Sequence, residues 1–133
     1  MFGKKNEGAP QGRIDSLIGA GTRVEGSIRF TGGLRIDGEI VGSVEAAEGA
    51  SSSTLVVSEH ARIEGAIHVA YLVTNGTIVG PVKVDESLEI QPKARIIGDV
   101  EYTVIEMHQG AVVEGRMEHR AGKSAELKEA APN

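Results

Sequence analysis

The chain of 133 residues contains no cysteine and no tryptophan, and aromatic residues make up only 3% of it. The absence of cysteine excludes a disulfide framework and is compatible with a reducing compartment such as the cytoplasm. With so few aromatic side chains, the core must be built from Val, Ile, Leu and Ala. The length suits one domain, so we predict a narrow interior of stacked aliphatic side chains.

Long apolar runs are also missing. No stretch reaches the roughly 20 apolar residues that a transmembrane helix requires, and residues 1–13 lack the apolar segment of a signal peptide. Phe2 occupies the position where N-myristoylation needs glycine, which excludes that anchor. The formal net charge of −5 argues against general nucleic-acid binding, so we expect no nucleic-acid partner.

Glycine, in contrast, is abundant, with 18 residues, and it marks an internal repeat. The shared motif is an apolar residue, any residue, Gly, any residue and an apolar residue. The motif glycines are Gly26, Gly42, Gly65, Gly80, Gly98 and Gly115, with successive spacings of 16, 23, 15, 18 and 17. Only the spacing of 23 breaks the period. It contains residues 45–53, which we interpret as an insertion of about six residues in a surface loop.

A period near 17 residues is too short for helix-pair repeats of about 33 residues or for leucine-rich repeats of ~20–29. It fits one coil of a β-helix with three short strands and three turns, at ~3.3 Å per residue. The predicted fold class is therefore all-β: a parallel β-helix (solenoid) of about six coils. We place the ordered domain at 14–117 and expect disordered tails at 1–13 and 118–133.

Side chains should alternate between the interior and solvent along each predicted strand. The positions that flank the motif glycines are apolar and should point inward, namely Val24, Ile28, Ile63, Ile67, Ile96 and Val100. Charged residues between them should point outward, namely Arg23, Glu25, Arg62 and Glu64.

The two ends of a β-helix carry unpaired backbone N–H and C=O groups, which template further strand pairing unless they are blocked. The sequence shows no obvious capping helix. Leu17 and Ile18 are expected to cover the first coil, and Val112, Val113 and Met117 lie near the open face of the last. We predict that these five residues form a polymerisation interface and that the chain stacks end to end into a filament. If like ends join like ends, each junction is two-fold symmetric and the filament has no polarity.

No sequence motif predicts a catalytic site. His60, His68, His108 and His119 occur in no metal-ligand spacing such as HExxH, and their polar or turn surroundings predict solvent-exposed side chains. A GxxxxGK[ST] phosphate loop is absent, and no motif places a base beside the serines at 51–53. We therefore expect no catalytic, metal or cofactor site, and assembly that does not depend on nucleotide.

The first residues combine apolar side chains with cations: Met1, Phe2, Lys4 and Lys5. This combination is typical of a small membrane-surface anchor. Burying Phe2 contributes about 2 kcal/mol, and each lysine near an anionic surface about 1 kcal/mol. The sum of about 4 kcal/mol gives only millimolar affinity, so stable binding needs a polymer that displays many copies. The alternative is an ordinary disordered start with chance lysines.

Over about residues 14–117 the chain resembles the bactofilins, which are bacterial polymer-forming cytoskeletal proteins. The resemblance rests on the six repeats, the segment Gly-Thr-Arg-Val-Glu-Gly-Ser-Ile at 21–28, the start Met-Phe-Gly-Lys-Lys and the two polar tails. It implies a right-handed β-helix and nonpolar, nucleotide-independent filaments on the inner face of the cytoplasmic membrane. It also implies a scaffold that recruits or positions cell-wall enzymes or other client proteins that shape the cell.

The resemblance further implies a polymerisation role for Val113, because relatives carry a large apolar residue, often Phe, two positions before the last repeat glycine. The alternative is that Val113 is only a core residue of the last coil.

Two other classes compete with a filament. A hexapeptide-repeat acyltransferase, on a left-handed β-helix, needs a strict six-residue phase, which the observed spacings do not keep. A β-helical adhesin or pectin-binding protein needs an export signal, and we expect none.

Overall fold

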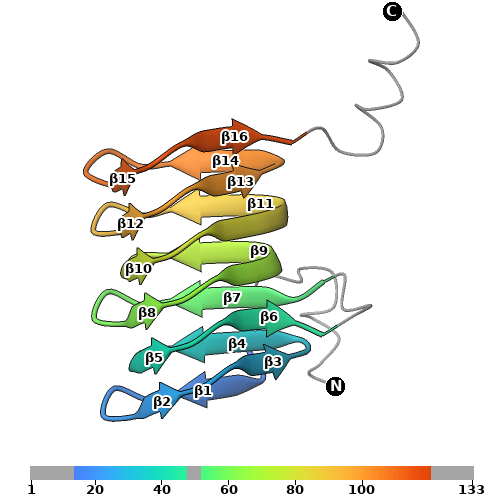
Figure 1. Cartoon of the computed structure of the whole chain (residues 1–133), viewed down its shortest axis with the longest axis vertical. Helices are drawn as coiled ribbons and strands as arrows, with labels where there is room; N and C mark the ends of the chain where they lie inside the picture. Colours follow the sequence, from blue (N-terminus) through green and yellow to red (C-terminus); the bar gives the residue numbers. More distant parts are fainter. Residues whose placement is uncertain (1–13, 48–51, 121–133) are drawn as a thin grey trace, which may run out of the picture.

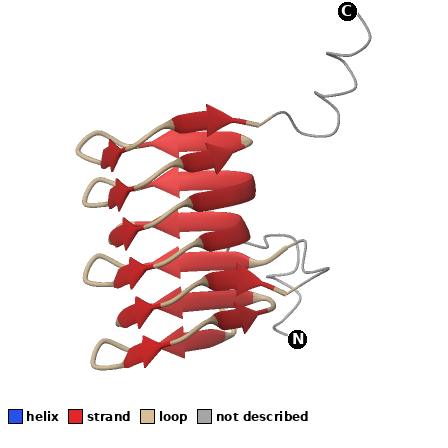
Figure 2. Ribbon diagram, viewed as in Figure 1, coloured by secondary structure: helices blue, strands red, loops and turns tan. Residues whose placement is uncertain are grey.

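The computed structural model describes residues 14–47 and 52–120, and every regular element in these ranges is a β-strand. The strands wind into a parallel solenoid of six stacked coils, from β1 at one end to β16 at the other (Figure 1). Strands and connecting loops make up the whole described structure (Figure 2). The predicted fold class, a parallel β-solenoid of about six coils, is confirmed.

Each coil contributes one strand segment to each of three faces. The first face is a six-stranded sheet of β2 (Arg23–Glu25), β5 (Glu39–Val41), β8 (Arg62–Glu64), β10 (Thr77–Val79), β12 (Arg95–Ile97) and β15 (Val112–Glu114). The second face contains β3 (Ile28–Phe30), β6 (Val44–Ala46), the first halves of β9 (Ile67–Thr74) and β11 (Val82–Ile90), β13 (Val100–Tyr102) and β16 (Met117–His119). The third face contains β1 (Ser16–Ile18), β4 (Gly33–Ile36), β7 (Thr54–Val57), the second halves of β9 and β11, and β14 (Val104–Met107).

The core consists of columns of aliphatic side chains, one residue from each coil. On the first face one column contains Val24, Ile40, Ile63, Ile78, Ile96 and Val113. On the second face another contains Ile28, Val44, Ile67, Val82, Val100 and Met117. In the four inner coils all these side chains are at most 2% exposed. The predicted inward positions are therefore confirmed.

The six motif glycines also occur at equivalent positions, one after each strand of the first face, with φ between +132° and +153°. Residues with a side chain rarely adopt this conformation. At Gly65 a Cβ would in addition collide with the carbonyl oxygen of Gly42 in the preceding coil. All six repeats thus require glycine for its backbone conformation, and the five after the first also require it for the close approach of the preceding coil.

The insertion that we interpreted at 45–53 is shorter in the structure than this range. Glu45 and Ala46 belong to β6, and Ser53 is fully buried, with its hydroxyl accepting a hydrogen bond from the Ala70 amide at 3.1 Å. Residues 48–51 lie outside the described ranges. At the other boundary, β16 carries the solenoid to His119, two residues beyond the expected end at 117. Of the tails expected at 1–13 and 118–133, residues 1–13 and 121–133 are not among the described residues.

Candidate polymerisation surfaces

The two ends of the solenoid differ from its sides because their strands pair with only one neighbour in the described structure. At the N-terminal end these edge strands are β1, β2 and β3, and at the C-terminal end they are β14, β15 and β16 (Figure 1). Within residues 14–47 and 52–120 no helix covers either end. Each edge therefore offers backbone groups that can pair with another chain.

The first coil exposes side chains that belong to core columns. We call Ile18, Val24, Ile28 and Phe30 the N-terminal end surface. The column neighbours of Ile18, Val24 and Ile28 are Ile36, Ile40 and Val44, which are all 0% exposed, whereas the first-coil residues are only partly buried. The difference arises because no coil formed by residues 14–47 and 52–120 lies on their outer side. Ala46, the neighbour of Phe30, is itself partly buried.

The last coil repeats this arrangement at the opposite end. Four apolar strand residues that continue inward columns, Ile105, Met107, Val113 and Met117, are what we call the C-terminal end surface. Their neighbours in coil five are Leu88, Ile90, Ile96 and Val100, and all four neighbours are 0% exposed. Met107 and Met117, in contrast, are 44% and 38% exposed. A second chain stacked on this coil would bury them.

The structure divides the five predicted interface residues into two groups. Ile18, Val113 and Met117 point inward and lie on the end surfaces. Leu17 and Val112 point outward, in register with the exposed Arg35 and Arg95, and are 60% and 43% exposed. Leu17 therefore does not cover the first coil as expected, and both outward residues lie on the sides of the end coils. The polymerisation role of all five residues stays a prediction.

Several end-surface residues were not predicted from the sequence to belong to the interface. These are Val24, Ile28, Phe30, Ile105 and Met107. The signal was available for Val24 and Ile28, because both flank the first motif glycine and were expected to point inward. An inward residue on a terminal coil is automatically part of an end surface.

The sides carry mixed charges that pair between neighbouring coils. On the first face Arg23 pairs with Glu39 at 2.9 Å and Arg95 with Glu114 at 2.9 Å. At a corner an ion pair spans two coils: the Lys93 ammonium lies 3.0 Å from Glu59, 34 residues earlier, and lowers the pKa of that carboxyl. Such exposed ion pairs contribute little to stability. They do give the sides a solvated character that the apolar end surfaces lack.

The predicted anchor residues Met1, Phe2, Lys4 and Lys5 lie outside the described residues. Among the residues that are described, no helix is long and apolar enough to span a bilayer.

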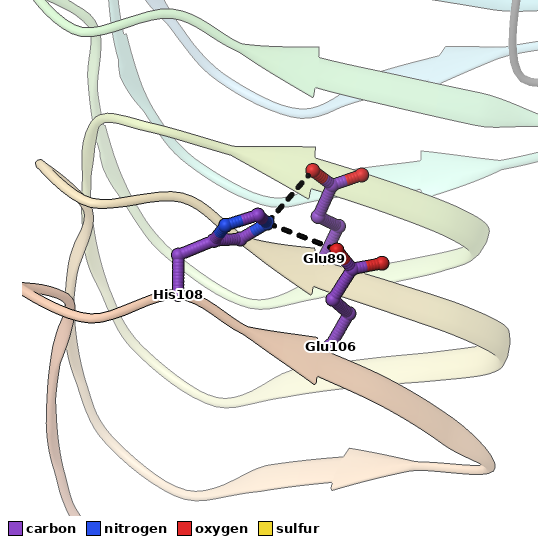
Figure 3. A group of neighbouring side chains, drawn as sticks. All are labelled: Glu89, Glu106 and His108. Atoms are coloured by element: carbon purple, nitrogen blue, oxygen red, sulfur yellow. Dashed lines mark hydrogen bonds and ion pairs between the residues drawn. The ribbon is translucent and has the colours of Figure 1, made fainter.

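The histidines occupy different environments. His60, His68 and His119 are exposed, as expected, and His68 faces Asp85 at 3.1 Å. His108 is instead half-buried and lies between the carboxylates of Glu89 and Glu106 (Figure 3). This group was not predicted from the sequence. The available signal was the 17-residue separation of Glu89 and Glu106, which is one coil.

The family model described as Bactofilin: Polymer-forming cytoskeletal matches residues 16–118. No curated protein and no solved structure gives a significant match to the chain. The matched range begins with β1 and reaches into β16, so it covers all six coils and both end surfaces. The chain therefore belongs to the bactofilin family of polymer-forming cytoskeletal proteins.

Proposed function

We propose that this protein assembles end to end, without nucleotide, into nonpolar filaments. The observation that carries the proposal is the contrast between the ends and the sides of the solenoid. Each terminal coil leaves inward aliphatic side chains and unpaired edge strands uncovered in the described structure, whereas the sides carry paired charges. Stacking a second chain on either end would bury apolar surface and satisfy the strand edges together.

Two arrangements of neighbouring chains would pair the edge strands of the terminal coils. In a head-to-tail polymer the C-terminal coil of one chain contacts the N-terminal coil of the next, and all strands stay parallel. In a nonpolar polymer like ends meet across two-fold axes, and the strands at each junction run antiparallel. We propose the second arrangement, which the family resemblance implies. The variants described in the Discussion distinguish the two.

Negative-stain electron microscopy of the purified full chain, with and without ATP or GTP, tests assembly itself. Thin filaments under both conditions are the expected result. Discrete trimers or monomers would contradict the proposal and lead back to the acyltransferase alternative, which acyl-CoA binding measured by calorimetry would then test.

We further propose that the filaments lie on the inner face of the cytoplasmic membrane and act as a scaffold there. Met1, Phe2, Lys4 and Lys5 would hold them to anionic lipid, each copy weakly and the polymer strongly. The exposed charged sides would remain free to recruit or position client proteins such as cell-wall enzymes.

Deleting residues 2–5 is expected to release the filaments from membranes without disassembling them. The deletion removes Phe2, Lys4 and Lys5, but no residue of the solenoid. Co-sedimentation with liposomes that contain anionic phosphatidylglycerol measures binding, and electron microscopy measures assembly. Deletion of residues 130–133 is the matched control, since it shortens the other tail by the same length. Undiminished co-sedimentation of the 2–5 deletion would contradict the anchor.

A further inference from the structure

A histidine and two glutamates converge on the third face of the solenoid, on the last two coils. Glu89 in β11 and Glu106 in β14 are register partners on adjacent coils, and His108 directly follows β14. The Nε2 atom of His108 lies 3.2 Å from Oε2 of Glu89 and 3.1 Å from Oε2 of Glu106 (Figure 3). One potential ligand atom from each residue lies within 4.8 Å of the other two.

Glu89 and Glu106 differ in their ion-pair partners from other glutamates that form ion pairs between coils. Glu39 and Glu114 each pair with an arginine of the adjacent coil. Among the described residues, the ion pairs of Glu89 and Glu106 involve His108 alone. Strands in a sheet lie about 4.8 Å apart, so the two carboxylates repel each other. His108 has at most one hydrogen on Nε2 to share between the negative charges of the two carboxylates. A bound cation would compensate them.

The distances also fit a single metal ion. Zinc binds imidazole nitrogen and carboxylate oxygen at ~2.0–2.2 Å, so neighbouring ligands of a tetrahedral site are about 3.3–3.6 Å apart. The observed separations of 3.1 and 3.2 Å from Nε2 to the two oxygens are slightly shorter than this range, so small side-chain movements would admit the ion. In addition, Nε2 of Gln91 donates a hydrogen bond to Oε2 of Glu89 at 3.2 Å. Such an outer partner orients a ligating carboxylate.

We propose that Glu89, Glu106 and His108 bind a divalent transition-metal ion, with Zn²⁺ as its representative. The side chains are 33%, 66% and 37% exposed, so water has access to complete the coordination. The nitrogen ligand favours Zn²⁺ over Mg²⁺, which prefers oxygen ligands alone. The ion would join coil five to coil six and would fix the residues on both sides of Met107, which lies on the C-terminal end surface. This inference does not depend on the proposed polymerisation.

Equilibrium dialysis of the untagged full chain against micromolar Zn²⁺ tests the site, because dialysis counts bound metal whether or not the protein is assembled. One Zn²⁺ per chain and no comparable uptake of Mg²⁺ are expected. Loss of an outer partner weakens metal binding about 10–100-fold, so loss of a ligand in His108→Asn should weaken it by at least as much. His68→Asn is the matched control, because His68 is an exposed histidine that faces the single carboxylate of Asp85. Its binding should equal that of the wild type.

Glu106→Gln provides a second variant in case His108→Asn does not fold, and it should also lose binding. Absorption spectra with Co²⁺ as the probe report directly whether nitrogen and oxygen ligands surround the metal. The wild type should give a ligand-field spectrum that His108→Asn lacks. Failure of the wild type to retain Zn²⁺, or equal losses in His68→Asn and His108→Asn, would overturn the proposal.

Discussion

Replacing Val113 with arginine is expected to convert the filaments into discrete dimers that are joined through their N-terminal ends. Val113 is an inward residue of the last coil, in register with the fully buried Ile96. Stacking a second chain on this coil would bury the new guanidinium without a partner, at a cost of about 3–5 kcal/mol. A two-fold junction would bring two such charges together. The C-terminal junction should therefore fail, while the N-terminal junction is left intact.

Val24→Arg is the counterpart at the opposite end of the same column. Val24 is also a half-buried inward valine on an edge strand, in register with the buried Ile40. This variant should form dimers joined through their C-terminal ends, and the double variant should be monomeric. A head-to-tail polymer contains a single kind of junction, so each single variant alone would then be monomeric. Sedimentation velocity distinguishes these outcomes directly.

Val79→Arg is the matched control for both end variants. It makes the same exchange on an inner coil, at an outward position in register with Glu64. Filaments should persist, because Val79 lies on a side and not on an end. Circular dichroism should show the same β-sheet signal for all variants. If Val113→Arg sediments like the wild type, or if Val79→Arg also abolishes filaments, the end surfaces are not what joins the chains.

The sequence was informative about the solenoid because the fold repeats one local pattern. Each motif glycine marks the corner after a strand of the first face, and the apolar residues on either side of it point inward. Once the glycines show which neighbouring residues point inward, six motif glycines predict six coils. This rule fails where two adjacent apolar residues lie outside a motif, as in Leu17–Ile18, whereas for Val112–Val113 the position of Gly115 already marks Val113 as the inward residue. In such a pair one side chain points inward and the other outward, and apolar character alone does not show which.

Contacts between coils were harder to predict than contacts within a repeat. Glu89 and Glu106 are far apart in the sequence, and only the strand register places them side by side. A search for local ligand motifs cannot find such a pair. The same register explains the exposed methionines, since Met107 and Met117 continue the buried columns of Ile90 and Val100. They are exposed only because the described chain has no further coil beyond them.

Gly65→Ala is expected to cause a large loss of folding stability, and Gly26→Ala about half that loss. Both glycines occupy the same repeat position with positive φ, +153° at Gly65 and +132° at Gly26. An alanine at either position adopts an unfavourable backbone conformation, which costs about 1–3 kcal/mol. Only at Gly65 does the added Cβ also collide with backbone, the carbonyl oxygen of Gly42 in the preceding coil. Overpacking of this kind adds about 1–3 kcal/mol.

Chemical denaturation followed by circular dichroism measures both losses, with Val24→Arg/Val113→Arg as the common background so that polymerisation does not add to stability. Around Gly26 no atom lies within 4 Å of the added Cβ, because no coil of the described chain lies on that side. The difference between the two alanine variants therefore isolates the contact between coils from the backbone conformation. Equal losses at positions 26 and 65 would show that φ alone makes glycine necessary and that the spacing between coils adjusts to a methyl group.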